Sequence, residues 1–319
     1  MTEIISKVAV IFVYLAVGYA ANRIGVLPDE SKKHLISLLM NITTPCLIFS
    51  TVTGRELDSS VMTDTLLSLV IMFVLLLLLD LLCIWICRRL GLAYPNELAL
   101  AMSAPNCGFI GIPITMAVFG QEVLYYVVIG NVSFNVFMYV VSGRLLHLGE
   151  DQAQRDRKTW RDTVRSLLAP VTVSSVLSVI LLFMGIHLPG WTDGIVTEIG
   201  DMTVPLSMIT VGVQLGSSRI GKIIRNKSVI LASIVKLIPV PALSVLLLAP
   251  FDLAPIVKLA IVLQMVFPTA VVSVVIAEYE GKNSGIAAET IAVTTLLSLA
   301  TLPVWIMILQ EMFIPHFNF

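Results

Sequence analysis

The chain has 319 residues, of which 57% are hydrophobic and only 13% are charged, and its mean hydropathy is +0.95. Soluble domains carry about 25% charged residues, so this composition predicts a polytopic membrane protein without a large soluble domain. The chain shows no basic stripe and no nucleic-acid-binding motif, so we expect no nucleic-acid partner. The formal net charge of −1 says little, because the distribution of charge across a membrane matters more than its sum.

Ten apolar segments follow one another along the chain, and each is close to the roughly 20 helical residues needed to cross a bilayer. The longest polar stretch, residues 149–165, divides them into two sets of five. We therefore predict an all-α fold with a first five-helix repeat over residues 1–148, a cytoplasmic linker over 149–164 and a second repeat over 165–319. The predicted spans cover approximately residues 4–23, 32–53, 62–87, 97–119, 122–146, 165–186, 195–216, 227–249, 255–277 and 285–310.

The distribution of Lys and Arg orients this bundle. Sixteen of the twenty basic residues fall in the connections that follow the odd-numbered spans, whereas Lys7, Arg55 and Lys258 lie on the opposite side and Lys236 lies inside a span. Cytoplasmic connections are enriched in Lys and Arg. We therefore expect a cytoplasmic linker and both termini outside.

The fourth span is interrupted near its centre. Residues 98–120 read LALAMSAPNCGFIGIPITMAVFG, and Pro105, Asn106 and Gly108 stand at the middle of this apolar segment. Proline removes a backbone donor and glycine disfavours a helix interior. A broken helix in hydrocarbon is tolerated only where protein or a water-filled cavity satisfies its backbone, and many secondary transporters build their substrate site this way. The alternative is a proline-kinked helix that serves packing alone.

Weak matches between the two halves indicate an internal repeat. GVLP at 25–28 matches GIHLP at 185–189, MNITTPCLI at 40–48 aligns with GDMTVPLSM at 200–208, and Pro105 of span 4 falls against Pro268 of span 9. The offsets at all three places are between 160 and 163 residues. Because each repeat has an odd number of spans, the second must be inverted relative to the first. Inverted repeats with a broken helix in corresponding positions point to a transporter site.

If the two broken spans cross at mid-membrane, the second half of each helix directs its N-terminus at the crossing. Such an end carries about half a positive charge and free N–H groups, and it binds anions without a fixed cationic side chain. Asn106 and Thr269 directly follow the two prolines and suit both helix capping and contact with a carboxylate, with capping alone as the alternative. The candidate substrate-binding residues of the breaks are Pro105, Asn106, Cys107, Gly108, Pro268 and Thr269.

Further polar side chains lie inside the spans. Asn131 and Asn135 share one helix face at a spacing of four residues, Asn41 lies in span 2, and Gln264 precedes Pro268 by four residues. We count all four as candidate substrate-binding residues. The alternative is that they hydrogen-bond neighbouring helices, as intramembrane amides often do.

Asp80 and Lys236 are the charged residues deepest in the predicted spans, about 12–14 Å from the cytoplasmic ends of their helices. Charges at this depth are rare and functional by default. We expect these two to face inward and either pair or approach the crossing, where they would neutralise the anion or carry a coupling proton. A purely structural buried pair is the alternative. Asp201 in span 7 is a third candidate, unless it sits at the outer membrane interface.

The same residues resemble the auxin efflux carrier family of membrane transporters, in its bacterial branch. The resemblance covers essentially the whole chain and is carried by NITTPCLIFS at 41–50, PNCGFIGIPITMAVFG at 105–120, QMVFPTAV at 264–271 and TTLLSLATLP at 294–303. It implies two inverted halves, a scaffold of spans 1, 2, 6 and 7, and a transport domain that moves like an elevator and resembles that of bile-acid/sodium symporters. It also implies a place in the bacterial inner (plasma) membrane and organic-anion substrates such as malonate, malate or auxin-like acids. Ala169-Pro170 departs from the Asn-Pro that often begins span 6 in bacterial members.

The sequence thus predicts a secondary transporter of small organic anions and no enzyme, because the four cysteines and four histidines form no metal or catalytic set. A sodium-coupled symporter and a ligand-sensing module without transport are the alternatives. We expect no cofactor apart from a coupled proton or sodium ion. The expected partners are the organic anion, the lipid bilayer and, by resemblance, a second copy of the chain bound through the scaffold helices.

Overall fold

The computed structural model describes residues 2–53, 59–149, 170–186, 189–217 and 226–314, and these residues are almost entirely helical. Five of their helical segments are long and apolar enough to cross a membrane, by length and composition. They are Ser31–Thr53, Ser59–Arg89, Cys107–Leu146, Lys227–Leu248 and Ser284–Phe313. The all-α membrane fold is therefore confirmed, whereas the count of ten crossings stays a prediction. The predicted linker lies outside the described residues, apart from Gly149.

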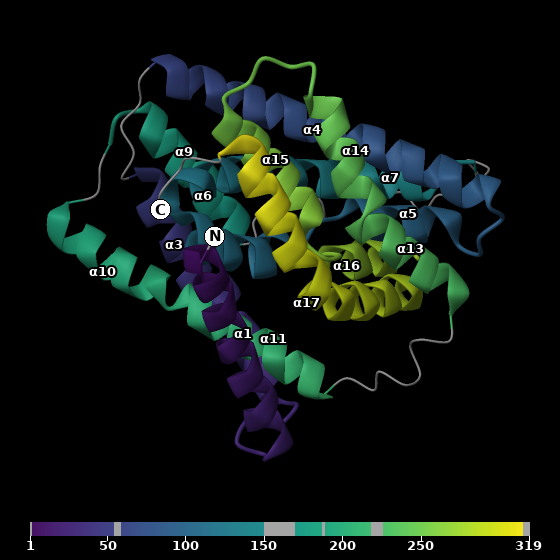
Figure 1. Ribbon diagram of the computed structural model, residues 1–319, viewed down its shortest axis with the longest axis horizontal. Helices are drawn as coiled ribbons and strands as arrows, with labels where there is room; N and C mark the ends of the chain where they lie inside the picture. Colours follow the sequence, from purple (N-terminus) through teal and green to yellow (C-terminus); the bar gives the residue numbers. More distant parts are fainter. Residues whose placement is uncertain (1, 54–58, 150–169, 187–188, 218–225, 315–319) are drawn as a thin grey trace.

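One group of helices is built around a close contact between α1 (Thr2–Arg23) and α11 (Thr203–Ser217), which lie side by side in Figure 1. A Cβ atom added at Gly18 would collide with the carbonyl oxygen of Ile209, and one added at Gly212 with that of Leu15. Glycine at these positions lets the two backbones touch. The other helices of this group are α2 (Ser31–Leu38), η1 (Leu39–Thr43), α3 (Thr44–Thr53), α9 (Pro170–Phe183) and α10 (Gly190–Asp201).

The second group packs around two interrupted helices, and α4 runs along its outer edge (Figure 1). Here α4 contacts α5 and α6, α15 contacts α6, and α17 contacts α13, α15 and α16. Its first-half members are α4 (Ser59–Arg89), α5 (Pro95–Ser103), η2 (Cys107–Gly111), α6 (Ile112–Val136), η3 (Phe137–Ser142) and α7 (Gly143–Leu146). Its second-half members are α13 (Lys227–Leu237), α14 (Pro239–Leu248), α15 (Pro255–Val266), α16 (Val272–Tyr279) and α17 (Ser284–Phe313).

Breaks in the helices fall where the sequence places proline and glycine. Gly120 has a φ of 72° within α6 and separates the residues of predicted spans 4 and 5. In predicted span 8, Ile238 leaves the helical conformation just before Pro239. The indole Nε1 of Trp305 donates to the carbonyl oxygen of Leu237 at 2.8 Å, so a carbonyl freed by this break finds a partner.

Predicted spans 2 and 7 are also irregular at positions that the predicted repeat aligns. In span 2, the π-helical turn η1 ends at Thr43, and in span 7 the helix is interrupted at Met202, directly before Thr203. Both threonine side chains are buried, and neither hydroxyl has a hydrogen-bond partner among the described residues. The two halves therefore share a local environment at this pair of positions.

Candidate functional site

The two interrupted helices cross at their breaks. Helix α5 ends at Ser103 and η2 begins at Cys107, while α15 ends at Val266 and α16 begins at Val272. Between these ends, the two extended segments form an antiparallel bridge at Pro105 and Thr269. The amide of Asn106 donates to the carbonyl of Pro268 at 2.8 Å, and the amide of Ala270 donates to that of Ala104 at 2.9 Å. The predicted meeting of two broken helices is confirmed.

This pairing explains how a broken helix survives inside an apolar bundle. Buried backbone groups need hydrogen-bond partners, and each break supplies them to the other. Thr269 adds two further links: its hydroxyl donates to the carbonyl of Ala101 at 2.7 Å, and its amide donates to the hydroxyl of Thr294 at 3.1 Å. Thr294 belongs to α17 and was not among the residues predicted for the site, although the TTLLSLATLP motif contains it.

The fourth span restarts with a capped helix end. The side-chain Oδ1 of Asn106 accepts a hydrogen bond from the amide of Phe109 at 3.2 Å, so the capping role predicted for Asn106 is present. Gly111 lies against the other break, because a Cβ atom there would come within 2.6 Å of the Phe267 ring. Glycine at this position therefore allows the two breaks to approach closely.

A cavity of about 300 Å³ lies beside the crossing. Six of the predicted binding residues line it: Pro105, Asn106, Cys107, Gly108, Asn131 and Asn135. Phe109, Phe134, Tyr139, Ala270, Val271 and Val272 complete the wall on the side of the crossing. The opposite wall comes from α2, η1, α9 and α11 through Ile36, Met40, Pro170, Val171, Thr172 and Gln214. The cavity therefore lies between the two groups of helices.

The other predicted binding residues, Asn41, Gln264, Pro268 and Thr269, do not line this cavity. The exposed side chain of Asn41 donates to the carbonyl of Ser37 at 2.7 Å, and its neighbour Met40 lines the cavity instead. Gln264 is fully buried behind Cys107, with its Oε1 3.5 Å from the Cys107 thiol and its Nε2 donating to Ala260 at 3.2 Å. Pro268 and Thr269 are buried in the junction between the breaks.

Asp80 and Lys236 both approach the crossing. The carboxylate of Asp80 accepts a hydrogen bond from the Ser103 hydroxyl at 2.8 Å, at the end of α5. Lys236 lies close enough to the Cys83 and Cys107 side chains to interact with them electrostatically. Its Nζ atom is buried and has no hydrogen-bond partner among the described residues, so the two charges do not form a hydrogen-bonded ion pair. Asp201 is exposed at the end of α10, as the interface alternative expects.

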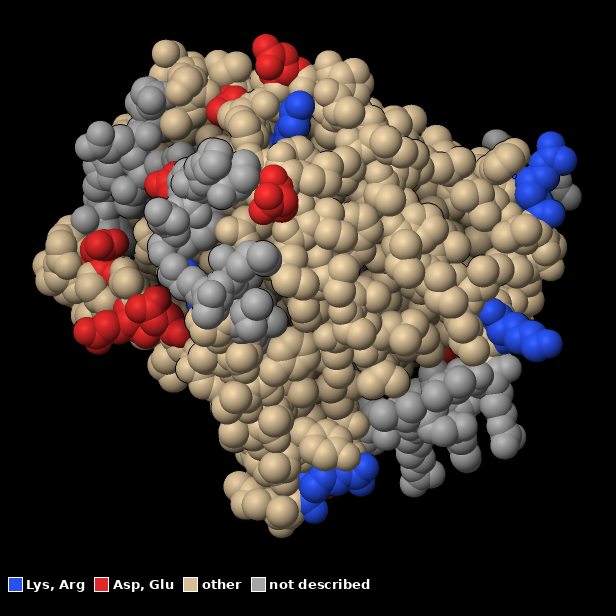
Figure 2. Space-filling view, in the orientation of Figure 1, with Lys and Arg blue, Asp and Glu red and all other residues tan. Residues whose placement is uncertain are grey.

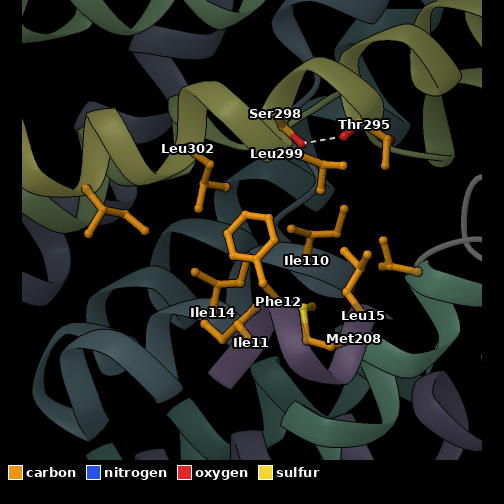
Figure 3. A pocket seen from close by; sticks show the side chains of 12 residues that line it. Ile11, Phe12, Leu15, Ile110, Ile114, Met208, Thr295, Ser298, Leu299 and Leu302 are labelled. Atoms are coloured by element: carbon orange, nitrogen blue, oxygen red, sulfur yellow. Dashed lines mark hydrogen bonds between the residues drawn. The ribbon is translucent and has the colours of Figure 1, made fainter. Parts of the chain in front are cut away.

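A second cavity, of about 40 Å³, lies where α1 and α11 meet η2, α6 and α17 (Figure 3). Ile11, Leu15, Ile110 and Met208 are among its apolar lining residues. The hydroxyl of Ser298 turns back to donate to the Thr295 carbonyl of its own helix at 2.8 Å. The lining of this small cavity is almost entirely apolar, so the larger cavity at the crossing is the candidate site.

The described residues contain no group of three or more His, Cys, Asp or Glu side chains arranged to hold a metal ion. The groups near the crossing that can interact with a ligand are side-chain amides, helix N-termini and the two buried charged residues. This arrangement suits binding of a small ligand.

Comparison with known proteins identifies the family of this chain. A family described as membrane transport protein matches residues 3–306. An uncharacterized transporter from Methanocaldococcus jannaschii is 24% identical over 304 residues, which cover 93% of this chain and 96% of that protein. An uncharacterized transporter from Methanothermobacter thermautotrophicus is 25% identical over 302 residues, covering 94% of this chain and 96% of that protein. The chain therefore belongs to the membrane transport protein family, that of the auxin efflux carriers, and it is a transporter rather than an enzyme.

Proposed function

We propose that this protein is a secondary transporter of small organic anions and that the cavity at the crossing is its substrate site. The observation that carries this proposal is the pairing of the two broken helices beside a cavity of about 300 Å³. That volume is at the lower end of the roughly 300–1,000 Å³ typical of small-molecule sites. A ligand of a few carbon atoms with one or two carboxylates is of a suitable size.

The charges and donors around the cavity favour an anion. The helix that restarts at Cys107 and the helix that starts at Val272 both begin beside the cavity, and helix N-termini stabilise negative charge. Two of the buried donors that lack a partner in the described part of the chain are near the cavity: the side-chain amide nitrogen of Asn131, a residue that lines it, and Nζ of Lys236, which is close enough to Cys107 to interact with it electrostatically. Buried donors are normally satisfied. A bound carboxylate would meet the first and lie in the field of the second.

Transport requires that the site open to each side of the membrane in turn. The two walls of the cavity come from different groups of helices. A sliding of the group that carries the crossing past the α1–α11 group would therefore expose the site alternately, as in an elevator. We place the ten spans in two inverted repeats on the same basis, since the aligned residues Pro105 and Pro268 both lie in breaks and Thr43 and Thr203 share their environment.

The surface charge fits the orientation in a plasma membrane with both termini outside and the linker cytoplasmic. On the face drawn in Figure 2, acidic side chains gather mainly toward the end where α10 lies, and basic side chains mainly toward the opposite end and the lower edge. A broad band with few charges separates them. Such a band suits the apolar part of a bilayer.

Sodium coupling is the alternative that one observation favours. The buried carboxylate of Asp80 in α4 accepts a hydrogen bond from Ser103 at the C-terminal end of α5. A helix C-terminus together with a carboxylate attracts a cation. A proton carried by the same carboxylate would serve equally. The nearby ammonium of Lys236 would repel a sodium ion beside Asp80 and therefore argues against sodium coupling.

Uptake of radiolabelled carboxylates into proteoliposomes tests the proposal. We expect saturable uptake above that of protein-free liposomes, and we expect it to persist when sodium is replaced by N-methylglucamine. Uptake that stops without sodium would favour the sodium-coupled symporter. Saturable carboxylate binding without any flux, in either direction and at either membrane potential, would contradict transport and favour the ligand-sensing module.

A further inference from the structure

The glycines that lie near the crossing have two kinds of surroundings. A Cβ atom added at Gly111 would come within 2.6 Å of the Phe267 ring, and one added at Gly130 would collide with the side-chain amide of Gln264. Glycine is required at these two positions because a larger residue would overlap a buried neighbour. At Gly108, in contrast, no heavy atom of the described residues would lie within 4 Å of an added Cβ atom. Packing therefore does not explain glycine at position 108.

The backbone conformation does not explain it either. Gly108 is the second residue of η2, and its φ lies outside the left-handed region that favours glycine. Alanine and larger residues can adopt such a conformation. Glycine destabilises a helix relative to alanine, because it loses more conformational freedom on folding. The chain therefore carries a less stabilising residue here without a gain in packing, and such conflicts are expected at functional sites.

The open space beside Gly108 belongs to the cavity at the crossing. Gly108 lines this cavity and is partly exposed, whereas the neighbouring Cys107 and Phe109 are buried. Asn106, two residues earlier, lines the same cavity, as does Asn131, whose side-chain amide nitrogen has no partner in the described residues. A carboxylate bound by these two amides would therefore place its adjoining carbon atoms close to Gly108.

We infer that Gly108 is a specificity-determining residue, and that the carbon atom bonded to the substrate's carboxylate occupies the space beside it together with its substituents. This inference rests on the proposed function, because it concerns the same cavity and the same anion. A side chain at position 108 would fill this space without disturbing the packing of the breaks. It would therefore discriminate against carboxylates that carry substituents at that carbon atom.

Two series of probes that differ only in methyl groups at this carbon atom test the inference. One series is malonate, methylmalonate and dimethylmalonate, and the other is acetate, propanoate and 2-methylpropanoate. At a pH of about 8 all their carboxyl groups are ionised, so the charge is constant within each series. Their affinities for the wild type, Gly108→Ala and Gly108→Val are measured by ligand-induced thermal stabilisation in detergent. Gly194→Ala in α10 is the matched control, because an added Cβ atom there also meets no heavy atom of the described residues within 4 Å.

The predicted result is a loss of affinity that depends on the methyl groups of the ligand. One methyl group in a pocket changes binding by about tenfold or more. We therefore expect Gly108→Ala to bind the methylated acids at least about tenfold more weakly than the wild type does, while the unsubstituted acid of the same series keeps most of its affinity. Gly108→Val should weaken the unsubstituted acids as well. Without ligand, Gly108→Ala should melt at or above the wild-type temperature, and Gly194→Ala should bind all probes normally.

The other results separate this inference from the proposed function. Gly108 variants that bind every probe as the wild type does, or that lose the same affinity for all members of a series, would overturn the inference. A wild type that binds only the unsubstituted acids would also overturn it, as would a Gly108→Ala protein destabilised as much as Gly111→Ala. Each of these results leaves a transporter of organic anions in place. Failure of the wild type to bind any carboxylate would overturn the proposed function and the inference with it.

Discussion

Lys236 is the residue whose surroundings most directly favour binding of an anion. Its ammonium is buried beside the crossing and has no hydrogen-bond partner among the described residues. A unit charge acting over about 10 Å at an effective dielectric constant of about 20 contributes about 1.7 kcal/mol. We therefore expect Lys236→Met to weaken carboxylate binding by about tenfold, measured by ligand-induced thermal stabilisation. Lys227→Met, at the exposed start of the same helix, is the control and should bind normally. Equal affinities of the two variants would contradict the role of Lys236.

Asn131 and Asn41 are two asparagines of the predicted spans with different surroundings, so one can serve as the control for the other. Asn131 is buried, lines the cavity and has an amide nitrogen without a partner in the described residues, whereas Asn41 is exposed and hydrogen-bonded to Ser37. Hydrogen bonds to charged groups contribute about 1.5–3 kcal/mol. Asn131→Leu should therefore lower the affinity for carboxylate by about tenfold or more, whereas Asn41→Leu should leave it unchanged. Normal binding by Asn131→Leu would show that this amide serves packing alone.

At the scale of the helices, the crossing depends on side chains that tie the breaks together. The hydroxyl of Thr294 in α17 accepts a hydrogen bond from the amide of Thr269, whereas the hydroxyl of Thr290, one turn earlier, donates to the carbonyl of Ile286 in its own helix. Thr294→Val leaves the buried amide of Thr269 unpaired, which costs about 1–3 kcal/mol. We expect it to lower the melting temperature by several degrees and Thr290→Val to have a smaller effect. Equal melting temperatures for the two variants would contradict the importance of the Thr269–Thr294 contact.

Alanine substitutions at two glycines, one in the contact between α1 and α11 and one in α10, should change the melting temperature in opposite directions. Alanine at Gly18 would press its Cβ atom into the Ile209 carbonyl, whereas nothing lies within 4 Å of the corresponding atom at Gly194 in α10. Overpacking typically costs about 1–3 kcal/mol, while alanine in an open helical position gains up to about 1 kcal/mol over glycine. Gly18→Ala should lower the melting temperature and Gly194→Ala should raise it slightly. A Gly18→Ala protein as stable as the wild type would contradict close backbone contact between α1 and α11.

The breaks of the helices could be predicted from the sequence because proline and glycine act on the backbone locally. Pro105, Pro268 and Gly120 interrupt their helices where the residue order predicts. The face of a helix is harder to predict when its turns are irregular. The π-helical turn Leu39–Thr43 has more residues per turn than an α-helix, and it is Met40 rather than Asn41 that lines the cavity.

Residues contributed by distant helices could not be predicted in the same way. Thr294, Thr172 and Gln214 reach the site only because α17, α9 and α11 pack around the crossing. No local spacing in the sequence encodes that packing. Asp80 and Lys236 were identified because charge is costly in lipid, but their separate contacts depend on how α4 and α13 are placed beside the breaks.

At the scale of the whole molecule, the described helices form two groups with different contents. The group with α1 and α11 is held together by backbone contact at glycine, and the other group holds the crossing and both buried charges. Because the cavity lies between them, a relative movement would change access to the ligand without breaking the hydrogen bonds of the crossing. We expect the first group to act as the scaffold and, where the protein forms a homodimer, to supply the interface.

The central claim is that the paired breaks of the two interrupted helices hold a carboxylate. An experimental structure with a brominated form of the carboxylate that stabilises the protein best tests it most directly, because the anomalous signal locates the bromine atom. We predict a carboxylate at the side-chain amides of Asn106 and Asn131, with the bromine atom inside the cavity at the crossing. A ligand bound in the apolar cavity between α1 and α17, or an experimental structure in which Pro105 and Thr269 do not pair, would contradict the claim.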